Sequence, residues 1–243
     1  MRLPILYVRN KILGEYKVKN AVIYIHGKYG TAEEAEYYKK FFKEADVIAF
    51  EYTSDYPWNF KKEFSTFFDD ICTKYKKISI IANSIGAYFI MISLSNKDIE
   101  KAFFISPIVD MEKLIIDMIL SENITEEELY KKKEIKTSFG ETLSWDYLTF
   151  ARKNPIEWNI PTYILYGKKD NMTSYEIILN FTNKSKANLT VMENGEHWFH
   201  TEEQMKFLKY TGVTGFQKTS ISKIKTFKNN ILTYEVAYFI CKK

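Results

Sequence analysis

Residues 78–94 read ISIIANSIGAYFIMISL, and this stretch decides the fold. Its first five residues are rich in β-branched side chains, which is typical of a short buried strand, whereas Tyr88 to Leu94 has the apolar character of a buried helix. The two segments are joined by ANSIG (82–86), which leaves almost no loop. A strand that becomes a helix within three residues holds the residue at the turn in a strained conformation. We therefore predict that Ser84 is presented at the end of a strand, over the positive end of a helix dipole.

Length and composition fit one soluble domain. A chain of 243 residues can bury a sizeable core, and 46% apolar with 27% charged residues is ordinary for a globular protein. The net charge of +4 would suit a nucleic-acid partner, but the segment 212–243 holds six lysines and one glutamate, a net +5 that leaves −1 for the first 211 residues. We therefore expect no basic groove for phosphates and no nucleic-acid partner.

The cysteines and the N-terminus bear on the compartment. Cys72 and Cys241 are too few for a disulfide framework. The apolar run near the N-terminus is bounded by Arg2 and Arg9 and is too short for the core of a signal peptide. No window approaches the roughly 18 apolar residues of a membrane span. These observations predict a cytoplasmic protein.

Short apolar runs alternate with helical patterns along most of the chain. The runs are 21–25, 47–52, 78–82, 101–106, 162–166 and 188–192. Helices are expected over 31–44, from Trp58 to Cys72, over 84–94, over 174–183 and over 201–210. Such alternation predicts an α/β fold with a doubly wound, mainly parallel sheet covered on both faces.

Two segments depart from this alternation. Between residues 107 and 159 we find no strand-like run but helical patterns over 111–120, 125–133 and 143–153, which predict a helical lid. After Gly212 the pattern alternates over 232–240, and Asn229-Asn230 could form the turn of a β-hairpin. We divide the chain into a domain over 1–211 and a C-terminal extension over 212–243. The extension has no assigned function, and the oligomeric state stays open.

A serine hydroxyl is a poor nucleophile unless a base removes its proton. The run 162–166 is followed by GKKD, which ends at Asp170, and the run 188–192 is followed by ENGEHWF, which contains His197. The carboxyl ends of parallel strands gather at one edge of a sheet, so these side chains can converge on Ser84. Asp110 is an alternative acid. His200 is an alternative histidine, although it would begin a helix and point elsewhere.

The motifs, taken in order, resemble those of the α/β-hydrolase family. They are HG at 26–27, A-x-S-x-G at 82–86, G-x-x-D at 167–170 and G-E-H at 195–197, within a resemblance that covers roughly residues 22–210. The chain is similar to small bacterial lidded serine hydrolases, the group of esterases, monoacylglycerol lipases and serine aminopeptidases. It departs from the family pattern at Ala82, where the usual residue is glycine, and in its tail.

The resemblance implies a triad of Ser84, Asp170 and His197. The tetrahedral oxyanion needs two preset donors, which we assign to the backbone N–H groups of Ile85 and Lys28, with Tyr29 as the alternative to Lys28. We expect the Lys28 ammonium to be solvated. The resemblance implies no metal and no cofactor, and a site built on His197 and His200 would lack a third ligand.

The expected reaction is hydrolysis of an ester or related acyl bond in a small, apolar substrate. Tyr29, Trp145 and Trp198 are the candidate substrate-binding residues. Two alternatives stay open. The first is a non-catalytic receptor or scaffold. The second is an aminopeptidase-type amide hydrolase, which would need an acidic pocket. Glu122 and Glu126 to Glu128 could supply that pocket, but they have the pattern of an exposed helix start.

Overall fold

A parallel six-stranded sheet forms the centre of the molecule. The computed structural model describes residues 19–95, 97–213 and 216. The strands lie in the order β2-β1-β3-β4-β7-β8, and every neighbouring pair is parallel. Their bounds are β1 Asn20–Ile25, β2 Ala45–Phe50, β3 Lys77–Asn83, β4 Lys101–Ile105, β7 Thr162–Gly167 and β8 Asn188–Met192. The predicted α/β class and parallel sheet are confirmed.

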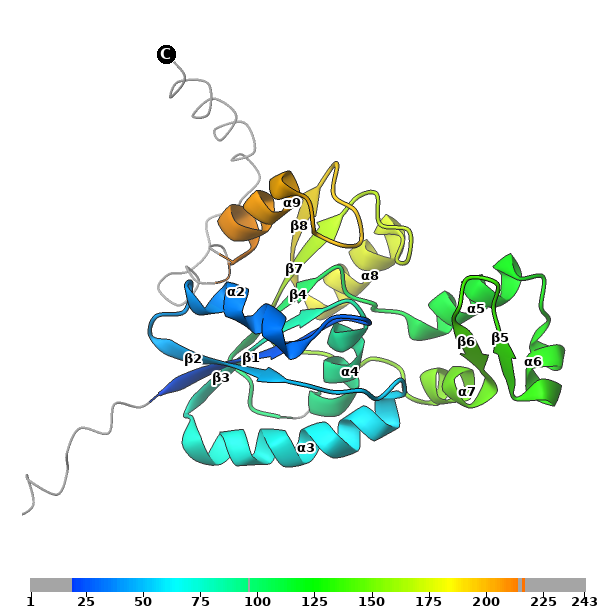
Figure 1. Cartoon of the computed structure of the whole chain (residues 1–243), viewed down its shortest axis with the longest axis horizontal. Helices are drawn as coiled ribbons and strands as arrows, with labels where there is room; N and C mark the ends of the chain where they lie inside the picture. The colour runs from blue at the N-terminus through cyan, green and yellow to red at the C-terminus, as the bar shows by residue number, and fades with distance from the viewer. Residues whose placement is uncertain (1–18, 96, 214–215, 217–243) are drawn as a thin grey trace, which may run out of the picture.

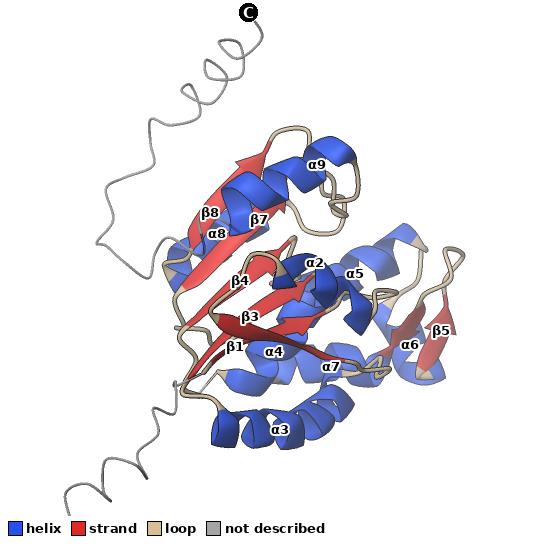
Figure 2. Cartoon of the chain, turned by 60° about the vertical axis from the view of Figure 1, so that its left-hand side comes forward, coloured by secondary structure: helices blue, strands red, loops and turns tan. Residues whose placement is uncertain are grey.

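Helices cover both faces of the sheet (Figures 1 and 2). Alternate residues of β1 belong to two separate apolar clusters: Ile23 and Ile25 face the cluster that contains α3 and α4, whereas Val22 and Tyr24 face the cluster that contains α2 and α9. This two-sided burial explains why the strands read as continuous apolar runs. The helices of the body are η1 Ala32–Ala35, α2 Glu36–Lys39, α3 Pro57–Lys74, α4 Ile85–Leu94, α8 Tyr175–Ser185, α9 Glu202–Phe207 and the π-helical η2 Leu208–Val213.

The strand order places a switch point between β1 and β3. The chain passes from β1 outward to β2 on one side and then returns to β3 on the other side, so the connections diverge between these two neighbours. Ligands of open α/β sheets bind at the carboxyl ends of the strands at such a point. Residue 26 follows the end of β1 and Ser84 follows the end of β3, so both lie at this edge.

The segment between β4 and β7, which the sequence predicts to form a lid and which we call the lid, extends to one side of the body (Figure 1). It contains α5 Met111–Ser121, α6 Glu126–Lys132, β5 Glu134–Lys136, β6 Thr142–Ser144 and α7 Trp145–Lys153. The expectation that this segment holds no strand is wrong, because β5 and β6 pair antiparallel. Each strand has only three residues, which is too short for an alternating pattern to be recognised.

One expected helix is shorter in the structure, and the predicted C-terminal hairpin lies outside the described residues. The helix expected to reach residue 44 ends at Lys39, because Phe41 and Phe42 lie in a turn and pack against the second apolar cluster. The predicted hairpin with its turn at Asn229-Asn230 lies outside the described residues, and the domain boundary at residue 211 stays a prediction. Across the described ranges, none of the helices combines the length and apolar character that a membrane crossing requires.

Candidate active site

Ser84 lies at a strained turn between β3 and α4. Its backbone has φ 49° and ψ −120°, a conformation that residues with a side chain rarely adopt. The turn is tight because α4 packs directly against the end of β1: a Cβ placed on Gly86 would lie 2.3 Å from the carbonyl oxygen of His26. Ala82, where the family pattern has glycine, is fully buried. The elbow predicted from the sequence is therefore present.

A chain of hydrogen bonds connects Ser84 to His197 and Asp170. Ser84 Oγ lies 2.8 Å from His197 Nε2, and His197 Nδ1 lies 2.7 Å from Asp170 Oδ2. The His197 side chain is 5% exposed and the Asp170 side chain is 0% exposed. A hydrogen bond between two such shielded groups is electrostatically stronger than one in water. The structure thus brings together the three residues selected from the sequence.

Two glycines allow the loops that carry Asp170 and His197 to touch. A Cβ on Gly167 would lie 2.5 Å from the backbone of the histidine loop, and the Lys169 N–H donates to the Gly195 carbonyl at 2.8 Å. The second carboxylate oxygen of Asp170 accepts from the N–H groups of residues 172 and 173, at 2.8 and 3.0 Å. These bonds fix the carboxylate before any substrate binds.

The charge of Asp170 is also felt by its neighbours. Burial, together with the nearby Asp170 carboxylate, raises the pKa of Tyr166 to about 12. The Tyr166 hydroxyl donates to the carbonyl oxygen of Thr173 at 2.8 Å, which supports the same loop. The acid loop is therefore held by a neutral phenol in addition to backbone bonds.

The alternative acid and histidine have other partners. The Asp110 carboxylate caps α5 by accepting from the Lys113 N–H at 2.9 Å. His200 precedes α9, its side chain is 63% exposed, and its Nδ1 lies 2.7 Å from the carbonyl oxygen of Trp198. Geometry therefore favours Asp170 and His197 over both alternatives.

Solved structures share this architecture over most of the chain. Est1E from Butyrivibrio proteoclasticus, solved with ferulic acid bound, has a TM-score of 0.68 at 16% identity, over 87% of this chain and 93% of that chain. Alpha/beta hydrolase domain-containing protein 10 from mouse has a TM-score of 0.66 at 14% identity, over 82% and 88%. The chain has the α/β-hydrolase fold. No protein-family model and no curated protein matches the sequence.

In this α/β-hydrolase fold two segments of backbone lie next to Ser84, the start of α4 and the loop after β1. Ile85 is the first residue of α4, and the first N–H groups of a helix have no partner within it. The loop after β1 approaches from the other side, since a Cβ on Gly27 would lie 3.3 Å from the Ser84 Cβ. Lys28 follows directly.

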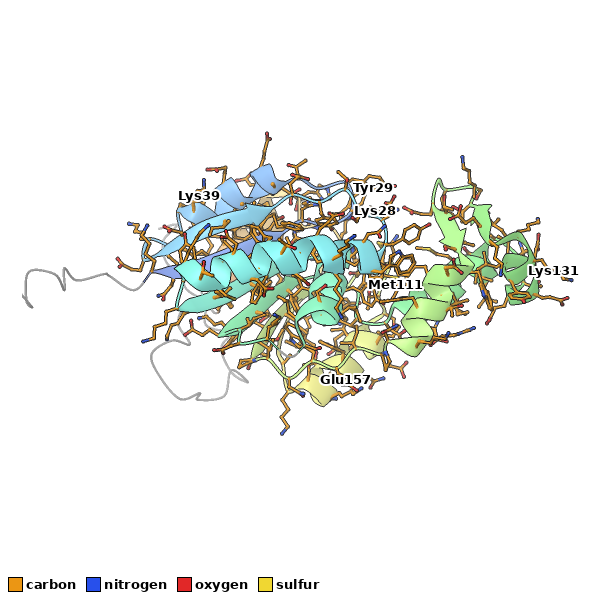
Figure 3. The ribbon with its side chains drawn as sticks, turned by 90° about the horizontal axis from the view of Figure 1, so that it is seen from below. Lys28, Tyr29, Lys39, Met111, Lys131 and Glu157 are labelled. Carbon is orange, nitrogen blue, oxygen red and sulfur yellow. The ribbon has the colours of Figure 1, made fainter. Side chains whose placement is uncertain are left out.

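The Lys28 side chain has a partner in the lid. Lys28 is exposed, as expected for a solvated ammonium, and its ammonium also forms an ion pair with Glu141. The Tyr29 hydroxyl donates to the other oxygen of the same carboxylate at 3.2 Å. Figure 3 shows both residues at the end of the body that faces the lid. No local sequence pattern points to Glu141, because it lies more than a hundred positions from Lys28 and Tyr29.

The candidate substrate-binding residues have different surroundings. Tyr29 is 77% exposed and Trp198, next to His197, is 64% exposed. Trp145 packs edge-on against Tyr130 within the lid, at 5.1 Å between ring centroids. Tyr29 and Trp198 are thus exposed neighbours of Lys28 and His197 in the chain, whereas Trp145 contacts Tyr130 inside the lid.

Metal binding was also considered. Among the described residues, no group of three or more His, Cys, Asp and Glu side chains is arranged to hold an ion. His26 is buried and stacks on Tyr52 at 4.2 Å between ring centroids.

Proposed function

We propose that this chain is a serine hydrolase that cleaves an ester or related acyl bond through an acyl-enzyme on Ser84. The observation that supports the proposal is the hydrogen-bonded series of Ser84, His197 and Asp170 at the carboxyl edge of the sheet. A serine on a strained elbow, within hydrogen-bond reach of a histidine that a buried carboxylate orients, is the arrangement that activates a hydroxyl.

The proposed steps follow from the atoms in contact. Ser84 Oγ attacks the substrate carbonyl carbon while His197 Nε2 takes the hydroxyl proton. The same nitrogen then gives that proton to the leaving alkoxide, which departs as the alcohol. A water molecule attacks the acyl-enzyme in the reverse sense and releases the acid. Asp170 holds the imidazole in the tautomer that leaves Nε2 free to accept, and it stabilises the imidazolium.

The oxyanion of the tetrahedral intermediate would be bound by the Ile85 N–H and by an N–H of the loop after β1, that of Lys28 or Tyr29. Loss of one such donor raises barriers by about 3–4 kcal/mol in enzymes of this type. The positive end of the α4 dipole would add to this stabilisation.

Aromatic side chains between lid and body support the proposed substrate class. Tyr56 and Trp58 stack at 4.7 Å at the beginning of α3, and Tyr147 and Phe150 of α7 pack against the Trp58 ring at 6.0 and 5.3 Å. This aromatic junction suits a small, largely apolar acyl ester, and the Est1E structure contains an aromatic acid, ferulic acid. We further propose a cytoplasmic location, as the cysteine content indicates.

Hydrogen bonds within the lid weigh against the acidic pocket that the aminopeptidase alternative needs. Both Glu122 oxygens accept from Ser138, and Glu126 is paired in two hydrogen bonds with Arg152. These carboxylates are therefore occupied inside the lid. A receptor or scaffold function would not need the three aligned side chains.

A fluorophosphonate probe tests the proposal. We expect stoichiometric labelling of the wild type, with peptide mapping to Ser84, and no labelling of Ser84→Ala. Hydrolysis of p-nitrophenyl acetate should fall by about 10³-fold or more in that variant. Ser54→Ala, in the loop before α3, is the matched control and should label normally. Folded wild-type protein that neither labels nor hydrolyses the ester would favour the receptor function.

A further inference from the structure

Two tyrosine rings, Tyr88 and Tyr147, pack near each other where the lid joins the body, and their hydroxyl oxygens are buried. Tyr88 belongs to α4 and is 1% exposed, and Tyr147 belongs to α7 of the lid and is 9% exposed. Their ring centroids are 6.4 Å apart. Within the described part of the chain, neither hydroxyl oxygen has a hydrogen-bond partner. A buried hydroxyl without a partner costs free energy, so two in one place indicate that a third polar group belongs between them.

The pair is placed to contact a substrate held at Ser84. Tyr88 lies in the first turn of α4, and this helix begins directly after Ser84. Long side chains of a helix point back toward its N-terminus, which is the end where Ser84 stands. Tyr147 approaches from the lid, with its ring packed against Tyr56 at 5.7 Å and Trp58 at 6.0 Å. The hydroxyls are thus polar points within an aromatic junction.

The surrounding charges define what the pair can bind. Burial raises the pKa of both Tyr88 and Tyr147, so both are neutral donors at physiological pH. The charged groups that act on them are carboxylates, Asp110 on Tyr88 and Asp55 on Tyr147. These carboxylates repel a negative ligand group. A neutral oxygen that accepts hydrogen bonds can bind to these donors, and the carboxylates do not repel it.

We propose that Tyr88 and Tyr147 form a specificity subsite that binds an uncharged acceptor oxygen of the substrate, such as a hydroxyl, ether or carbonyl oxygen away from the reacting ester group. The inference rests on the serine hydrolase function proposed above and refines it: the preferred ester is apolar except at one position. Because Tyr147 is part of the lid, the subsite is complete only when the lid lies against the body.

Matched ester pairs test this subsite. In a panel of p-nitrophenyl and alkyl esters, each CH₂ of the acyl and alcohol chains is replaced in turn by an ether oxygen, and kcat/KM is measured for each pair. We expect the wild type to prefer the oxygen-containing ester at one position, by about tenfold or more. Tyr88→Phe, Tyr147→Phe and the double variant should lower that preference toward one, mainly through KM.

The controls distinguish failure of the tyrosine subsite from failure of the serine hydrolase function. Tyr75→Phe removes a hydroxyl that donates to Asp46 at the opposite edge of the sheet, and its preference should match the wild type. The two phenylalanine variants should have a Tm equal to or above that of the wild type, since each removes a buried hydroxyl that has no partner among the described residues. If the wild type is labelled but shows no preference for an oxygen-containing ester, the subsite is overturned. It is also overturned if the double variant retains the preference, because the two hydroxyls would then bind only a structural water. Loss of labelling in the wild type would overturn the proposed function itself.

Discussion

The loops that carry Ser84, Asp170 and His197 and the lid are held in place by different kinds of contact. In the body, backbone lies against backbone: Gly86 against the His26 carbonyl, and Gly167 against the loop at Gly195. No side chain can be inserted at these approaches without moving the chain. The lid instead reaches the body through side chains, with the Glu141 carboxylate between Lys28 and Tyr29.

This difference separates the chemistry of the site from its selectivity. Backbone contacts in a close-packed fold hold the reacting groups to a fraction of an ångström and tolerate little change. Exposed ion pairs and aromatic contacts hold the lid with energies that are individually small. Substitutions at the sheet edge should therefore abolish function or folding, whereas substitutions in the lid should produce graded effects.

The largest effect is expected for Asp170→Asn. The amide would hold the His197 imidazole in the wrong tautomer, so kcat for p-nitrophenyl acetate should fall by about 10⁴-fold with little change in Tm. Asp110→Asn is the control and should leave kcat within a few-fold of the wild type, since its carboxylate caps α5. An equal loss of kcat in both variants would mean that the acid is wrongly assigned.

Gly86→Ala is expected to destabilise the fold. Alanine is normally favoured over glycine inside a helix by about 1 kcal/mol. Here its Cβ would lie 2.3 Å from the His26 carbonyl oxygen, and overpacking of this kind costs about 1–3 kcal/mol or more. Urea unfolding should show the loss. Ser93→Ala, on the same helix at a buried hydroxyl without a partner, should be neutral or stabilising. A stabilised Gly86→Ala would show that the elbow is not close-packed.

Much of the body could be predicted from local sequence. Strand β8 has the expected bounds, and β1, β3, β4 and β7 differ by one residue at one end or at both, because a strand buried on both faces is a continuous apolar run. The residues of the site could also be selected, since Ser84, Asp170 and His197 each follow a recognisable strand. The helix after Thr31 was overestimated, because the apolar residues Phe41 and Phe42 serve a packed turn.

The lid shows where local sequence is insufficient. Its hairpin has strands too short to recognise, and the contact of Glu141 with Tyr29 joins residues 112 positions apart. In the sequence, Tyr88 and Tyr147 look like ordinary core residues. Only their placement on facing elements shows that neither hydroxyl has a hydrogen-bond partner among the described residues. Contacts of this kind depend on how the lid folds over the body, and no short pattern encodes them.

Glu141→Gln tests whether the lid supports the loop of the body that contains Lys28 and Tyr29. The substitution weakens the hold on Lys28 and Tyr29, whose loop carries a proposed oxyanion donor. We expect kcat to fall by about tenfold, less than the loss of a whole donor would produce. Glu127→Gln breaks the exposed pair with Lys131 on the lid and should leave kcat unchanged. Equal rates in both variants would show that the lid does not support this loop.

The smallest effect is expected for Arg152→Met, which removes the side chain that joins α7 to Glu112 of α5 and Glu126 of α6. Exposed pairs contribute about 0–1 kcal/mol, so Tm should fall by a few degrees at most.

Hydrogen bonds from Arg152 lower the pKa of Glu126. A carboxyl with a lowered folded-state pKa stabilises the fold above its unfolded pKa of about 4.3, and that contribution is lost as the pH falls through the folded value. The difference in Tm between wild type and variant should therefore be present at pH 7 and disappear in strong acid. Lys153→Met, at the adjacent position, should show no such pH dependence, and a difference that persists in acid would assign the effect to lost packing.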